Sequence, residues 1–157
     1  MSHALWAAYL ATVLDIALPR GDVRRLEQRH ALTPQEWPFS EDRAWIMTAC
    51  NPRSEQLPHD VNAERHEVLK VQIEDMGYTA LPNVGFDPTD PTWREQGFTI
   101  PGISEPEVRD LATAWDQNAI FGWWPERWEL VGVLLDGRSI GAWRWTEPGG
   151  QDYLIDT

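Results

Sequence analysis

The residues best suited to chemistry in this 157-residue chain are a carboxyl group and several amides that lie far apart in the sequence. Glu95 follows Trp93 in the segment WRE, and a glutamate beside an aromatic wall is a candidate general acid or base. Gln117 and Asn118 stand in the segment WDQNAIF, between two apolar runs, where a simple turn would favour glycine or proline. Because buried amides need hydrogen-bond partners, these positions predict a polar cluster.

Other kinds of reactive site have weaker support in the sequence. The chain lacks a glycine-rich dinucleotide motif, a phosphate-binding loop and a GxSxG nucleophile motif, so we predict no cofactor. The four histidines lack the spacing of a zinc site, so we predict no metal: they are His3, His30, His59 and His66. Cys50 lies in the apolar run AWIMTAC, which favours a buried thiol over a nucleophile.

Composition and charge limit the classes of partner. The length predicts a single domain over residues 1–157, and the formal net charge of −12 disfavours nucleic acid and anionic membranes while favouring a protein partner with a basic surface. The apolar run at 4–14 is shorter than the ~20 residues of a membrane span and has no preceding Lys or Arg, so we predict a buried helix and no secretory leader. The single cysteine fits a reducing compartment, and we predict a cytoplasmic protein.

Strand and helix patterns alternate along the middle of the chain. Ser104 and Glu107 form a capping-box pattern ahead of an apolar helical face, and Asp60 and Gly77 bound an earlier helix. Strands are predicted at 44–50, 78–84, 97–100 and 119–124, followed by a hairpin over 129–145 that turns at Asp136-Gly137. Residues 15–44 and 85–93 have the composition of irregular loops.

This order predicts an α+β fold, a ferredoxin-like split β-α-β sheet (βαββαβ) with an added N-terminal helix and C-terminal β-hairpin. A doubly wound parallel sheet is the alternative, because its strands would also be short and apolar.

In the split arrangement, chain direction brings the polar residues to one end of the sheet. The predicted cluster comprises Asn51, Arg53, Ser54, Asn62, Trp93, Glu95, Gln117 and Asn118. Two interpretations stay open. The amides can tie loops together by bonding exposed backbone groups near strand ends, which we prefer, or the cluster can form a polar pocket.

Five tryptophans lie within residues 123–145, and aromatic residues there can form a binding surface or a core. We predict a non-enzymatic binding or protein-interaction module, with Trp143 and Trp145 on the possible partner face. The alternative is a small enzyme with a polar site around Glu95, Asn51 and the amides Gln117 and Asn118.

An ordered set of motifs over roughly residues 5–124 resembles the domain of unknown function 3293 family. The resemblance comprises an aromatic N-terminal helix around Tyr9, the segment TACNP at 48–52, a helix that begins near Asn62, WRE at 93–95 and WDQNA at 115–119. This chain has Trp115-Asp116 where the family usually has Phe-Gly, and Gly97 where a serine is usual. The resemblance implies that these residues belong together, and it assigns no reaction to them.

Overall fold

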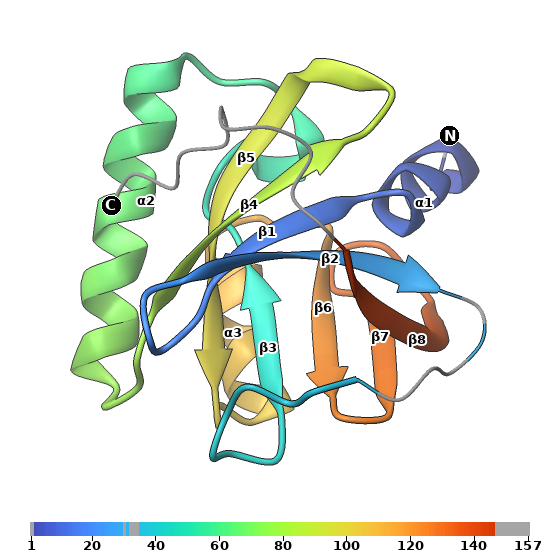
Figure 1. The fold of residues 1–157 in the computed structure, drawn as a ribbon. Helices are drawn as coiled ribbons and strands as arrows, with labels where there is room; N and C mark the ends of the chain where they lie inside the picture. The colour runs from blue at the N-terminus through green and yellow to red at the C-terminus, as the bar shows by residue number, and fades with distance from the viewer. Residues whose placement is uncertain (1, 30, 32–34, 147–157) are drawn as a thin grey trace.

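Antiparallel pairing closes the sheet of this protein on itself in the computed structural model, which describes residues 2–29, 31 and 35–146 (Figure 1). Among the described residues, eight strands follow one another around a closed barrel in the order β1-β2-β8-β7-β6-β3-β5-β4. The strands are β1 (Val13–Ala17), β2 (Val23–Arg29), β3 (Ala44–Met47), β4 (Leu81–Asp87), β5 (Asp90–Pro101), β6 (Ala119–Trp124), β7 (Arg127–Gly132) and β8 (Arg138–Thr146). The helices are α1 (Ser2–Leu10), α2 (His59–Asp75) and α3 (Glu105–Ala114), with a 3-10 turn η1 (Pro52–Ser54).

The predicted ferredoxin-like fold is wrong, and so is the parallel alternative, because every strand pairs antiparallel in a closed barrel. The segment β3-α2-β4-β5-α3-β6 keeps the predicted chain order, and its strands are neighbours in the order β6-β3-β5-β4. An open sheet would end at β4 and β6. Here β1 pairs with β4 and β7 pairs with β6, so neither strand is an edge.

Several segments that close the barrel have a different secondary structure from the one predicted for them. The apolar run at 4–14 is not one buried helix, because α1 ends at Leu10 and β1 begins at Val13. Part of the polar region 15–44 forms β2, whose Leu26 is fully buried, and the region 85–93 forms the β4–β5 hairpin. Each described helix is too short or too polar to cross a membrane.

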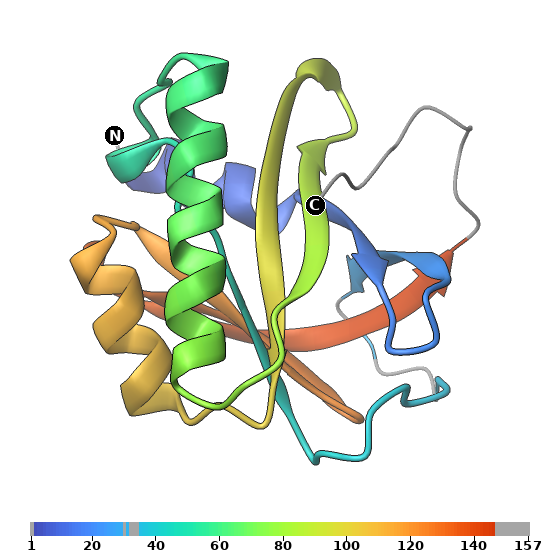
Figure 2. The ribbon, with the colours of Figure 1, turned by 90° about the vertical axis from the view of Figure 1, so that its left-hand side faces the viewer.

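Two hydrophobic cores follow from the alternation of side chains along the strands. Residues such as Leu14, Ile46 and Trp123 point into the barrel and pack together there. Trp45 and Phe98 point outward and pack against the apolar faces of α2 and α3. Figure 2 shows the two helices against the same side of the barrel.

Local signals explain how these helices begin. The Ser104 side chain accepts a hydrogen bond from the Glu107 backbone, and the Glu107 side chain accepts one from Ser104, so the predicted capping box of α3 is confirmed. The prediction that Asp60 caps α2 is wrong, since the helix begins at His59 after Pro58 and Asp60 lies in its first turn. An acidic residue there still interacts favourably with the helix dipole.

Candidate binding pocket at one end of the barrel

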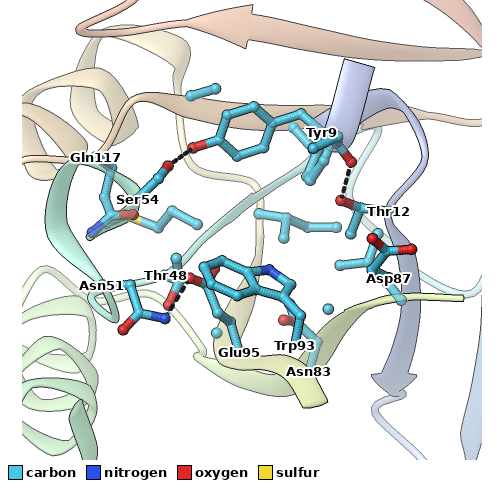
Figure 3. A pocket seen from close by; sticks show the side chains of 18 of the residues that line it. Tyr9, Thr12, Thr48, Asn51, Ser54, Asn83, Asp87, Trp93, Glu95 and Gln117 are labelled. Carbon is cyan, nitrogen blue, oxygen red and sulfur yellow. Dashed lines mark hydrogen bonds between the residues drawn. The ribbon is translucent and has the colours of Figure 1, made fainter. Parts of the chain in front are cut away.

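A cavity of about 310 Å³ opens into the barrel at the end where α1 crosses it (Figure 3). Its apolar wall includes Ile46 and Met47 near the end of β3 and Ala119 and Phe121 from the start of β6. Leu5 and Ala8 of α1 form part of its cover. The cavity therefore lies between the barrel interior and the N-terminal helix.

Two glycines on β4 and β5 line this cavity and differ in the space around them. Across the two strands, Gly85 pairs with Glu95 and Asn83 pairs with Gly97, so each polar residue faces a residue without a side chain. A methyl group at Gly97 would lie 2.7 Å from the Met47 carbonyl oxygen, which leaves space only for glycine. A methyl group at Gly85 would make ordinary contact with Thr12 Cγ2 at 3.4 Å. Gly85 therefore marks the part of the wall that can accept a larger residue.

Glu95 places a carboxyl group on the cavity wall. Its Oε2 accepts a hydrogen bond of 2.8 Å from Asn51 Nδ2. Burial raises the pKa of Glu95 to about 7, although the hydrogen bond from Asn51 acts in the opposite direction. None of the described residues that line the cavity is basic, so no cation there offsets the burial. Glu95 can therefore gain or lose a proton close to neutral pH.

Asn51 is fixed in place by the loop around it. Its Oδ1 accepts hydrogen bonds from Asn62 Nδ2 at 2.7 Å and from the Leu57 backbone at 3.0 Å, while its own backbone N–H donates to Asn62 Oδ1 at 3.0 Å. With Oδ1 occupied by these donors, the Asn51 amide presents its N–H to Glu95. Asn62 thus orients the group that holds the carboxylate.

A second set of hydrogen-bonded polar side chains lies beside the cavity and begins at α1. The Tyr9 hydroxyl lies 2.8 Å from Ser54 Oγ, and Asn118 Nδ2 donates to the same oxygen at 3.0 Å. Burial raises the pKa of Tyr9, so this phenol is neutral at physiological pH. The three residues link the N-terminal helix to η1 and to the start of β6.

Gln117 lines the cavity but directs its amide toward the backbone. Its Nε2 donates to the Cys50 carbonyl at 3.2 Å and to the Trp115 carbonyl at 3.1 Å. These bonds join the loop after β3 to the loop before β6. For this residue the geometry is that of a tie between loops.

The backbone around the pocket is strained. Asn51, Arg53, Ser54 and Asp116 are the non-glycine residues of the described chain with positive φ, between 48° and 63°. The Arg53 N–H donates to the Asp116 carbonyl at 2.7 Å, which joins the two strained loops. Backbone strain of this kind is concentrated at functional sites.

The structure brings the eight predicted residues to one end of the barrel. Those that line the cavity are Asn51, Ser54, Trp93, Glu95 and Gln117. Asn62 and Asn118 contact lining residues from behind, and Arg53 extends toward solvent, where it pairs with Asp116 at 3.5 Å.

Other pocket residues escaped the sequence analysis. They are Asn83, Gly85, Asp87 and Asp90, whereas Tyr9, Thr48 and Gly97 entered only through the family resemblance. Alternation of Asn83 and Gly85 on one strand face was an available signal. The Gly, Pro and Asp content of residues 85–93, which predicts a loop, hides this alternation.

The tryptophans expected at a partner face lie elsewhere. Trp143 is only 1% exposed and packs edge to face against Trp123 inside the barrel. The Trp145 ring is covered by Arg24 and donates its Nε1–H to the Glu36 carbonyl at 3.0 Å. Both side chains are therefore engaged by contacts within the protein.

The family described as "Protein of unknown function (DUF3293)" matches residues 47–120, which confirms the resemblance seen in the sequence. The matched segment contains Asn51, Glu95 and Gln117 and leaves out α1 with Tyr9. No curated protein and no solved structure matches the chain. Within the described ranges, no group of three or more His, Cys, Asp or Glu side chains is arranged to hold a metal ion.

Proposed function

We propose that this protein binds a small molecule in the cavity of its barrel, with Glu95 as the polar group that recognises it. The observation that carries this proposal is a carboxyl group in a largely apolar cavity, held by an amide and unaccompanied by a basic residue among the described lining residues. Cavities of roughly 300–1,000 Å³ with apolar walls and a few placed polar groups are typical small-molecule sites.

The cost of building this pocket supports a functional role. A carboxyl group whose pKa is raised by burial destabilises the fold when it ionises. The positive φ angles of Asn51 and Ser54 add backbone strain next to it. Features that lower stability are retained where they serve binding or catalysis.

The two interpretations of the polar cluster apply to different residues. Gln117 bonds backbone carbonyls, as a residue that ties loops together would. Glu95 accepts a bond from a side chain and faces the cavity, so the loop-tying interpretation does not account for it.

A second candidate function is general acid–base catalysis by the same carboxyl group. It is favoured by the pKa of Glu95 of about 7, which is matched to proton transfer at neutral pH. In this version Glu95 takes a proton from a bound substrate, and the neutral Tyr9 hydroxyl can donate a hydrogen bond to it. Turnover by the wild type and its loss in Glu95→Gln, with binding retained, would distinguish an enzyme from a binding protein.

The experiment that tests the binding site is a fragment screen by ligand-observed NMR against two leucine variants. Gly85→Leu fills the cavity from its open wall, whereas Val71→Leu adds the same side chain to an exposed position on α2. Fragments that bind the wild type and Val71→Leu but not Gly85→Leu would support the site. Binding that is the same in all three proteins would place the fragments elsewhere and contradict the proposal.

The chemistry of the chain also supports proposals for its cellular location and for the charge of its partner. The free, buried thiol of Cys50 supports the cytoplasm as its location, which cell fractionation with a tagged chain would test. The net charge of −12 supports a partner with a basic surface, and such a complex should weaken as salt is added.

A further inference from the structure

We propose that the ligand of this cavity is a small organic cation, an amine with an aromatic or apolar body, and that its ammonium group pairs with Glu95. The inference rests on the proposed binding function and adds the charge and chemical class of the ligand. It is carried by the distribution of carboxyl groups, aromatic rings and unfilled space around the cavity.

The charges of the lining select a cation. Asp87, Asp90 and Glu95 line the cavity, and the described lining contains no Lys, Arg or His. A ligand carboxylate or phosphate would meet three acidic groups and no counter-charge, within a protein whose formal charge is −12. These acidic groups would attract an ammonium group throughout its entry into the cavity.

Asp87 differs from Glu95 in the direction of its pKa shift. Asp87 Oδ1 accepts from the Thr89 backbone at 2.8 Å and from the Thr89 hydroxyl at 2.7 Å, and these bonds lower the pKa of Asp87. Asp90 accepts from Thr92 in the same manner. The β4–β5 hairpin therefore presents negative charge near the cavity, which draws a cation toward the deeper carboxyl group.

Aromatic rings face the same space. In Figure 3, Tyr9 of α1 and Trp93 of β5 lie on opposite sides of the cavity, with Glu95 next to Trp93. The faces of tyrosine and tryptophan rings attract ammonium groups, and their apolar surface accepts the carbon skeleton of the ligand. Gly85, directly across from Glu95, leaves the space that an ammonium group needs.

A metal ion fits this arrangement less well. The described residues hold no cluster of three or more metal-ligating side chains. Much of the remaining wall is apolar, as at Leu14, Ile46 and Phe121, which suits a carbon skeleton and not a hydrated ion.

The proposal implies that binding releases a proton. Protonated Glu95 and an ammonium ligand combine to give the carboxylate–ammonium pair and one proton in solvent, so charge and atoms balance. Tyr9 and Cys50 interact electrostatically with Glu95, and burial raises the pKa values of both, so both stay neutral between pH 6 and 8. Asp87 remains ionised in this range because its pKa is lowered. The pH dependence of binding between pH 6 and 8 therefore belongs to Glu95.

Calorimetry with three matched probes tests the inference: 2-phenylethylamine, 2-phenylethanol and phenylacetate. We expect the amine to bind most tightly and the carboxylate least. Because the pKa of Glu95 is about 7, the amine affinity should rise about tenfold from pH 6 to pH 8, with close to one proton released at pH 6 and almost none at pH 8. Glu95→Gln should remove the pH dependence and weaken the amine while leaving the alcohol unchanged.

The other outcomes would contradict the cationic ligand alone, or the cationic ligand together with the binding site. Equal, pH-independent binding of amine and alcohol, lost in Gly85→Leu, would overturn the cationic ligand and leave the proposed binding function standing. Tightest binding by phenylacetate would also overturn the cation. If none of the probes binds at millimolar concentration while other fragments bind in a manner sensitive to Gly85→Leu, the cationic class is wrong. If no fragment of any class depends on that variant, both proposals fail.

Discussion

The two ends of the barrel interior are built in opposite ways. At one end, where β6 ends and β7 begins, Trp123 and Trp128 fill the interior with Trp143 and meet Phe39 from the preceding loop. At the other end, a cavity of about 310 Å³ lies beside Gly85 and Glu95. The first end is filled by aromatic rings, and the second is hollow and carries a carboxyl group.

The difference shows how a barrel of this size is made solid or hollow. The interior of an eight-stranded barrel is just wide enough for side chains to fill it or for one small ligand to occupy it. Large inward residues on β6, β7 and β8 supply the first outcome, and the lack of a side chain at Gly85 on β4 contributes to the second. Substitutions at the two ends should therefore affect stability with different size and sign.

The largest effect is expected from Trp123→Ala. This side chain is fully buried among aromatic rings, and its removal leaves a large void, so we expect a loss of about 3–5 kcal/mol in the free energy of unfolding. Trp93→Ala removes the same side chain from the cavity wall, where one side of the ring faces empty space, and should cost less. Thermal melts of both variants measure the contrast. Equal losses would mean that the two ends are packed alike.

Glu95→Gln is expected to stabilise the protein at high pH. The folded-state pKa of about 7 lies above the ordinary value of 4.5, so the folded wild type binds the proton more tightly and loses stability as the pH rises from about 4.5 through 7. The neutral amide avoids this cost, which amounts to at most about 3 kcal/mol at pH 8 and disappears near pH 4. Denaturant titrations at both pH values measure the difference.

Glu107→Gln is the matched control for that variant. Hydrogen bonds from Tyr78 and Ser104 lower the pKa of Glu107, so its carboxylate contributes stability above the unfolded-state pKa. Its replacement should lower stability at pH 8, opposite in sign to Glu95→Gln. The same sign in both variants would show that Glu95 is not a buried, destabilised carboxyl group.

Gln117→Ala tests whether the Gln117 amide joins two loops at the hollow end or contacts the ligand. The side chain is 5% exposed and donates to two backbone carbonyls. Its loss removes the donor to the Cys50 carbonyl, while the Trp115 carbonyl keeps its bond from Arg65, and should cost about 1–3 kcal/mol. For a chain of this length, each kcal/mol lowers the melting temperature by about 2–4 °C. Gln56→Ala, at an exposed position of the described chain, is the control and should change stability by less than about 0.5 kcal/mol. An unchanged melting temperature in Gln117→Ala would assign its amide to the ligand.

The smallest expected effect is a gain from Arg53→Gly. Arg53 has φ of 56°, which costs an ordinary residue about 1–2 kcal/mol, and its exposed ion pair with Asp116 contributes little. After the entropic cost of glycine, we expect a gain of about 0.5 kcal/mol. Arg20→Gly, an exposed arginine outside the positive-φ set, should give no gain. A loss of stability in Arg53→Gly would show that the strained loop is held by its side chain.

Local signals predicted the elements well where one pattern governed a segment. The capping box at Ser104 places α3, and the apolar run after Asp116 places β6. The joint between α1 and β1 was hidden because apolar residues continue from the helix to Leu14 without a break. In β2 only Leu26 is fully buried, so its sequence VRRLEQR carries little strand signal.

The candidate site was more predictable than the fold around it. Asn51, Glu95 and Gln117 come together because β3, β5 and β6 are neighbours, and the chain order of these elements was predicted correctly. The pairings that close the barrel, β1 with β4 and β2 with β8, join segments far apart in sequence and have no local signature. Tyr9 reaches the pocket only through this closure.

Closure of the barrel also sets the order in which the protein can mature on the ribosome. β8 is the last strand of the described chain, and it joins β2 to β7. Until it emerges, both partners expose unpaired backbone edges, which are templates for pairing with other chains. Pairing across such separations makes folding slow, so the nascent chain spends time in this state. A truncated chain that ends before Arg138 should therefore be a substrate for chaperones and proteases.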